Sequence, residues 1–183
     1  KTCGIVNTVE SSISRIADCV LPIFAGPEIG VASTKAFLGQ MLVLYLLSLK
    51  IAHERNEMTD ESYKIKMKDL IELPNLTKKV LSEESKIQII AKDIVSSKGA
   101  MFLGRGTSYP IALEGALKLK ELSYIHAEGY PAGEMKHGPL ALIEEGLPVI
   151  ILVPKDKYFE ITISIMQEVI ARGGKVLAIT TEN

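Results

Sequence analysis

The sequence predicts an α/β protein with a parallel sheet and helices on both faces. Short apolar runs alternate with longer segments of helical periodicity, which is typical of βαβ units. The runs at 100–103, 149–153 and 176–179 contain no polar residue, as expected of parallel strands buried on both faces. The chain has 183 residues, 47% hydrophobic and 23% charged, so it can bury a sizeable core.

The first third of the chain predicts two strands and one long helix. Residues 3–6 and 19–24 are apolar runs separated by a polar turn, and each predicts a buried strand. A helix is then expected to start with Ser33 or Thr34 as its N-cap, because a hydroxyl can accept a hydrogen bond from a free amide at a helix start. This helix should run to about His53.

The part of this helix from 37 to 51 is apolar nearly all round. A membrane span is not expected, because the run is too short and three polar residues interrupt it: Gln40, Ser48 and Lys50. We therefore expect a fully buried core helix or a dimer-interface helix.

Residues 54–98 predict a charged helical connector. One helix is expected over 60–73, a break at Pro74, and a second helix over 82–97. Lysines and acids alternate along both, which is typical of a solvated face.

From Gly99 onward the pattern predicts a doubly wound parallel sheet. The expected elements are strand 100–103, helix 110–123, strand 125–127, strand 149–153, helix 158–171 and strand 176–179. Ligands of such sheets bind at the carboxyl ends of the strands, which here gives three candidate loops: 104–109, 129–137 and 154–157.

The helix over 110–123 carries a narrow charged stripe. Glu114, Lys118 and Glu121 are spaced by four and three residues, so all three lie on one face of an otherwise small and apolar helix. They can be a pair of ordinary helix salt bridges. They can also be a catalytic cluster, because partly desolvated carboxylates held by an ammonium are candidate proton carriers.

Composition argues against several partners. A formal net charge of −1 offers no field for nucleic acid. Cys3 and Cys19 have neither the density of a disulfide framework nor a metal-ligand spacing, and His53, His126 and His137 are scattered. We predict no metal, no nucleic acid and a cytoplasmic protein.

Three motifs together resemble one family: GVASTKAF at 30–37, LGRGTSYPIALEGALKLKELSYIHAE at 103–128 and GEMKHGPLALI at 133–143. They are similar to the isomerase part of the glutamine–fructose-6-phosphate aminotransferases, which make glucosamine 6-phosphate. The resemblance covers essentially the whole chain. It implies flavodoxin-like sugar isomerase (SIS) domains, fructose 6-phosphate as substrate, a homodimer, and no metal or organic cofactor.

The resemblance also implies roles for the charged stripe. Glu121 matches the base that moves a proton between the first two sugar carbons through an enediol-like or enamine intermediate. Lys118 matches the lysine that assists proton movement at the sugar oxygens, and Glu114 the carboxylate that holds the network. His137 matches the histidine that opens the sugar ring across the dimer interface; from the residues alone it is a loop histidine.

Two residues of the first SIS domain, Val31 and Ser33, fall where the family reaches toward the sugar, and the helix-cap prediction for Ser33 is compatible with this. His126 and Glu134 lie in matching motifs but also fit ordinary structural roles, so they are left out of the catalytic set.

By its motifs, the chain is expected to be a fragment that spans two SIS domains: 1–55 the end of the first, 56–98 the connector, and 99–183 most of the second. It should lack the glutaminase domain, the phosphate-binding loop and the Schiff-base lysine, and hence the full reaction. We also hypothesise that residues 2–53 supply a missing sheet edge to 99–179, within one chain or by swapping in a dimer.

Two other functions are open on this evidence. One is a different SIS enzyme, such as a sugar-phosphate isomerase or a deglycase, with the same base helix. The other is a non-catalytic module that binds a sugar phosphate to regulate a partner.

Overall fold

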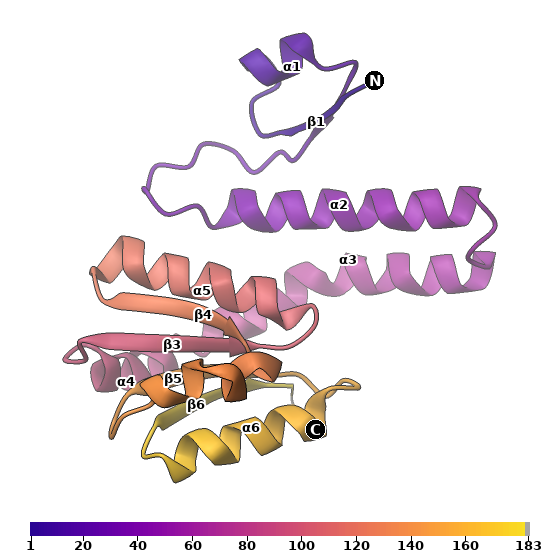
Figure 1. Ribbon diagram of the computed structural model, residues 1–183. Coiled ribbons are helices and arrows are strands. Elements are labelled where there is room, and N and C mark those ends of the chain that lie inside the picture. Colours follow the sequence, from indigo (N-terminus) through magenta and orange to yellow (C-terminus); the bar gives the residue numbers. More distant parts are fainter. Residues whose placement is uncertain (182–183) are drawn as a thin grey trace. The chain divides into compact units, whose positions relative to one another are not determined.

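The computed structural model describes residues 1–181 and divides into two compact units, Lys1–Glu84 and a second that begins at Ser85 (Figure 1). The first contains β1 (Cys3–Val6), α1 (Ser12–Ile16), β2 (Cys19–Pro22), α2 (Lys35–Glu54) and α3 (Asp60–Ser82). Its two strands are parallel and form a separate sheet, with Cys3 opposite Cys19 and Val6 opposite Pro22.

Helix α2 differs from the expected buried helix. Of its residues only Leu49 is buried, because a two-stranded sheet is too small to cover a helix of 20 residues. The length argument against a membrane span was also wrong. By length and composition alone α2 could cross a membrane, although the core helix of a soluble protein meets the same criteria.

Helix α3 runs through Pro74, where a break was predicted. Proline removes one backbone hydrogen bond from a helix. The carbonyl that loses its partner is that of Leu70, which is half-buried, and Pro74 itself is exposed. The break falls at Glu83 instead, just before α4 (Glu84–Ile94).

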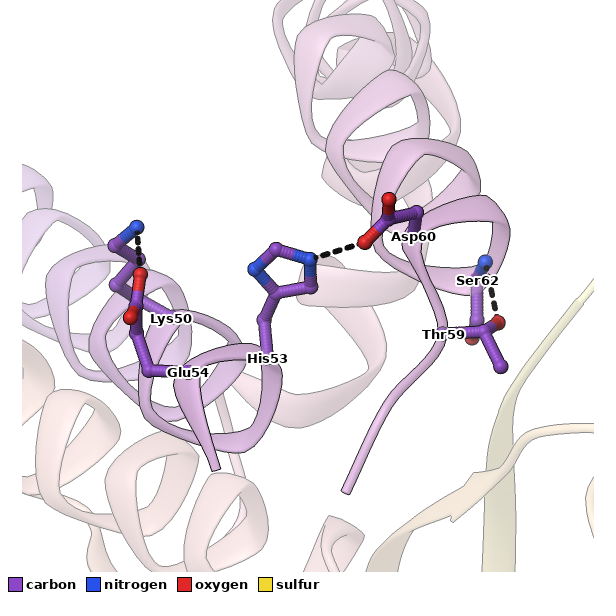
Figure 2. Close-up of polar contacts among 6 residues, drawn as sticks. All are labelled: Lys50, His53, Glu54, Thr59, Asp60 and Ser62. Carbon is purple, nitrogen blue, oxygen red and sulfur yellow. Dashed lines mark hydrogen bonds and ion pairs between the residues drawn. The ribbon is translucent and has the colours of Figure 1, made fainter. Parts of the chain in front are cut away.

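Side-chain contacts fix the junction of α2 and α3 (Figure 2). Nε2 of His53 lies 2.7 Å from Oδ1 of Asp60, and the His53 ring stacks on Tyr63 with centroids 4.5 Å apart. The side chain of Thr59 caps α3 by accepting from the Ser62 amide. The hydrogen bond from His53 lowers the pKa of Asp60 below its ordinary value.

The second unit is the predicted parallel α/β sheet. Its strands, in the spatial order β4-β3-β5-β6, are all parallel. Counted from the first strand of the unit this is the order 2-1-3-4, the flavodoxin-like order. The elements are β3 (Gly99–Gly104), α5 (Ser108–Ser123), β4 (His126–Pro131), β5 (Pro148–Val153), α6 (Phe159–Ala171) and β6 (Lys175–Thr180), with short helices η1 (Ala132–His137) and η2 (Pro139–Leu142) after β4.

Helices cover both faces of this sheet, as predicted. Figure 1 draws α5 and α6 on opposite sides of the strands, and the two clusters of buried side chains agree. One cluster joins α6 to residues such as Leu103 and Ile151, which are fully buried. The other places Ala116 of α5 against Ala100 and Ala127.

One expectation for strand pairing was wrong. Strand β4 extends to Pro131, so Gly129 and Pro131 pair with β3 and do not lie in a loop. Within the first unit β1 pairs with β2. The hypothesis that residues 2–53 supply an edge to the sheet of 99–179, within one chain or between two copies, stays a prediction.

Candidate active site

Helix α5 is held against the sheet by close backbone approaches at glycines. A Cβ at Gly104 would clash with the backbone of Ser108 and lie 2.8 Å from the Tyr109 amide nitrogen. A Cβ at Gly129 would lie 2.9 Å from the Leu113 Cα, and one at Gly115 would lie 2.9 Å from the Phe102 ring. These contacts let the helix pack directly on β3 and β4 and so fix its rotation.

That rotation gathers the three predicted charges into one cluster. Lys118 Nζ lies 2.7 Å from Glu121 Oε2 and 3.3 Å from Glu114 Oε1. The side chains are 21–30% exposed, so they are neither buried nor freely solvated. One ammonium therefore holds two carboxylates and orients both.

The charge of Lys118 is secured by its partners. The hydrogen bond to Glu121 raises the pKa of Lys118, burial acts in the opposite direction, and Glu114 adds to the rise. Lys118 is therefore an ammonium at neutral pH, with two of its three N–H groups directed at carboxylates. The bond uses Oε2 of Glu121, and among residues 1–181 no hydrogen bond or ion pair engages Oε1.

Apolar side chains border the cluster on the open side of α5. Ala112 and Ala116 are buried, whereas Ile111, Leu117 and Leu122 are 37%, 40% and 66% exposed. An ordinary solvated helix face would carry polar residues at such positions. The arrangement is that of a wall with a narrow polar stripe, able to contact both the carbon skeleton and the hydroxyl groups of a small ligand.

His137 is not part of this cluster within the described chain. It is exposed, ends η1 and follows the carboxyl end of β4, whereas Glu121 precedes the start of that strand. Helix α5 runs from the carboxyl ends of the parallel strands back to their amino ends. His137 therefore lies at the carboxyl ends of the strands, and Glu121 lies toward their amino ends. His126 and Glu134, both exposed, make no contact with the cluster either.

Val31 and Ser33 lie in the first unit, in the segment between β2 and α2. Val31 is 90% exposed, while Ser33 is half-buried. Thr34 occupies the N-cap position of α2, but its side chain makes no capping hydrogen bond. The Glu28 carboxylate caps the helix instead, because it accepts hydrogen bonds from the amides of Thr34 and Ala36 at 2.9 and 3.2 Å. The hydrogen bond from the Thr34 amide is the largest cause that lowers the pKa of Glu28, and the bond from the Ala36 amide lowers it further.

A second polar feature lies at the carboxyl edge of the four-stranded sheet, where ligand loops were predicted. An open pocket of about 360 Å³ is lined by residues that follow β3, β4 and β5, among them Arg105, Glu134 and Tyr158. The Arg105 guanidinium lies over the Tyr158 ring, 5.4 Å from its centroid. The sequence indicated the loops but not these side chains, although an arginine between two glycines was a usable signal.

Within residues 1–181 no group of three or more His, Cys, Asp or Glu side chains is placed to hold a metal ion.

The strand order, the covered faces and the charged wall of α5 define a flavodoxin-like α/β protein with a candidate proton-transfer site. The chain belongs to the SIS domain family, which matches residues 1–50 and 93–183.

Over nearly its whole length the chain is similar to part of the isomerizing glutamine–fructose-6-phosphate aminotransferases. It is 53% identical over 180 residues to that of Bartonella quintana and 52% identical over 179 residues to that of Bradyrhizobium diazoefficiens. Each match covers 98% of this chain but only 30% and 29% of the relative. The chain thus spans about a third of these proteins' length.

A solved structure gives the same result. The C-terminal domain of glucosamine-fructose-6-phosphate aminotransferase from Francisella tularensis matches with a TM-score of 0.95 and 44% sequence identity. The match covers 97% of this chain and 50% of that chain.

Proposed function

We propose that this chain forms part of the isomerase portion of a glutamine–fructose-6-phosphate aminotransferase and contributes the proton-transfer wall of its active site. The observation that carries the proposal is the Glu114–Lys118–Glu121 cluster, which lies on a helix packed closely against the sheet. The reaction class is a ketose–aldose isomerisation coupled to amination, with fructose 6-phosphate as substrate.

Glu121 is the proposed base. Its Oε2 is engaged by Lys118 at 2.7 Å, so Oε1 is the atom offered to a substrate proton. In the proposed step Oε1 takes a proton from C1 of the sugar and an enediol-like or enamine intermediate forms. The same oxygen then returns the proton to C2, so the carboxylate is regenerated.

Lys118 supports this step from the same helix turn. As negative charge grows on the sugar oxygen, the remaining N–H of the ammonium can donate to it, and a fixed cation in a partly desolvated site stabilises such charge. Glu114 keeps the ammonium in place at 3.3 Å from the other side.

The remaining parts of the proposed site come from elsewhere. Val31 and Ser33 are proposed to contact the sugar from the first SIS domain, and His137 to open the sugar ring in the partner subunit of a homodimer. The exposure of His137 and the uncovered apolar side of α2 support an assembly larger than this chain. A cytoplasmic location fits the two free cysteines.

The proposal includes an assignment of domains. We propose that residues 1–55 form the end of one SIS domain, that residues 99–183 form the beginning of a second, and that residues 56–98 connect the two. Membership of the SIS family also favours α2 as a core helix of a soluble protein over a membrane span.

The experiment that tests the proposal is a chimera. These 183 residues replace the matching segment of the Bartonella quintana aminotransferase, to which they are 53% identical. Formation of glucosamine 6-phosphate from glutamine and fructose 6-phosphate supports the proposal. Isomerisation of a sugar phosphate without amination would favour another SIS isomerase, and sugar binding without any turnover would favour a regulatory module.

A further inference from the structure

Cys3 and Cys19, distant in the sequence, lie directly opposite each other in the structure. They are register partners on the parallel strands β1 and β2, and both are free and exposed. Neighbouring strands are about 4.8 Å apart, and register partners point to the same face of a sheet. No sequence pattern joins these two residues, and the proposed catalytic function uses neither.

The register places the two Cα atoms within the range that a disulfide can bridge. Bridged cysteines have Cα atoms about 4.4–6.8 Å apart, a range that includes the strand spacing. The pKa of Cys3 is raised, chiefly by its neighbour Cys19 and to a lesser degree by burial, in agreement with this placement.

Neighbouring contacts hold the pair together independently of the thiols. The Cys19 amide donates to the carbonyl of Thr2 at 3.2 Å, and the Thr2 amide donates to the carboxylate of Asp18 at 2.5 Å. The start of β1 is therefore tied to the start of β2 immediately before the cysteines, and the strand pairing continues after them at Gly4 and Val20.

We propose that Cys3 and Cys19 form a dithiol site that exchanges with small-molecule disulfides such as glutathione disulfide. The Cys19 thiolate attacks one sulfur of glutathione disulfide, and one glutathione leaves as its thiolate. Cys3 then loses its proton and attacks the Cys19 sulfur of the mixed disulfide, which releases the second glutathione. The net change is one protein disulfide and two reduced glutathiones from one protein dithiol and one glutathione disulfide.

The site lies at the starts of both strands, whereas Val31 and Ser33 follow the end of β2. Because parallel strands begin at the same edge, the dithiol is at the edge of the sheet away from that segment. The exchange therefore does not depend on the proposed sugar site, and its test is independent of the proposed function.

The test is intact-mass analysis of the 183-residue chain after equilibration with mixtures of reduced glutathione and glutathione disulfide and blocking of free thiols. The wild type should lose two hydrogens and carry no adduct. Cys3→Ser and Cys19→Ser should each carry one glutathione. At a fixed concentration of reduced glutathione, half-conversion of the wild type should need at least about tenfold less glutathione disulfide than either variant, because the second thiol acts at a high effective concentration.

A second measurement tests whether the advantage of the wild type depends on the paired strands or only on the presence of two cysteines in the chain. In urea sufficient to unfold the chain, the advantage of the wild type should fall by about tenfold or more, because the strands no longer align the thiols. The proposal is overturned if the folded wild type accumulates two glutathione adducts, if it forms disulfide-linked dimers instead, or if urea leaves the advantage unchanged.

Discussion

Replacing Gly129 by alanine tests how α5, and with it the charged cluster, is held on the sheet. The new Cβ would lie 2.9 Å from both Cα and Cδ2 of Leu113 and 3.1 Å from its nitrogen. Carbon atoms in contact normally lie about 3.5–4.0 Å apart, so the overlap is about 0.6 Å or more. A new Leu113 rotamer would relieve the contact with Cδ2 only, and the helix backbone must therefore move away from β4.

Overpacking of this kind costs about 1–3 kcal/mol. The unit that begins at Ser85 has the size of a small domain, for which each kcal/mol lowers the melting temperature by about 4–8 °C. We therefore expect Gly129→Ala to melt roughly 5–20 °C below the wild type in circular dichroism. Gly99→Ala is the matched control, because its Cβ would meet only the His126 carbonyl oxygen at an ordinary 3.4 Å. Equal melting temperatures for the two variants would refute the packing described for α5.

Two further predictions concern titratable groups of the first unit. Glu28→Gln should destabilise α2, because the Glu28 carboxylate accepts from the amides of Thr34 and Ala36. The pKa of Glu28 is lowered in the folded state. The Glu28 carboxylate therefore contributes its full stabilisation above the unfolded pKa of about 4.3, and this stabilisation is lost as the pH falls through the folded pKa. In urea unfolding, the free energies of unfolding of wild type and variant should differ at pH 7 and become equal in acid. For the His53–Asp60 pair, His53→Gln should raise the pKa of Asp60 toward its ordinary value, as read from the carboxyl carbon in an NMR titration.

Each of these two predictions has a result that would contradict it. A difference between wild type and Glu28→Gln that persists unchanged into strong acid would mean that the carboxylate charge is not what caps α2. An Asp60 titration curve that is the same with and without His53 would mean that the contact drawn in Figure 2 is not populated in solution.

The second unit could be predicted closely from the sequence because its strands are apolar runs bounded by turn residues. The runs at 100–103 and 149–153 lie inside β3 and β5, and the spacing of Glu114, Lys118 and Glu121 was sufficient to place them on one face of α5. The apolar runs and the helical spacing each depend on residues close together in the sequence. They can therefore be recognised without knowledge of the tertiary contacts.

Non-local contacts explain what the sequence did not predict. Gly129 and Pro131 read as loop residues, yet they lie in β4, because the strand is paired through β3 and the glycine makes room for Leu113. Pro74 predicts a helix break, yet α3 continues through it. No periodicity indicates that Cys3 faces Cys19, since register is set by the whole sheet.

The most direct test of the proposed function is Glu121→Gln in the chimeric aminotransferase. The amide keeps the shape of the side chain and can still contact Lys118, but it cannot take up the sugar proton. Formation of glucosamine 6-phosphate should fall by about 10²–10⁴-fold while binding of fructose 6-phosphate stays nearly intact. Glu160→Gln, an exposed glutamate on α6, is the matched control and should leave turnover unchanged. Wild-type turnover in Glu121→Gln would remove Glu121 from the mechanism and reduce the α5 cluster to a pair of helix salt bridges.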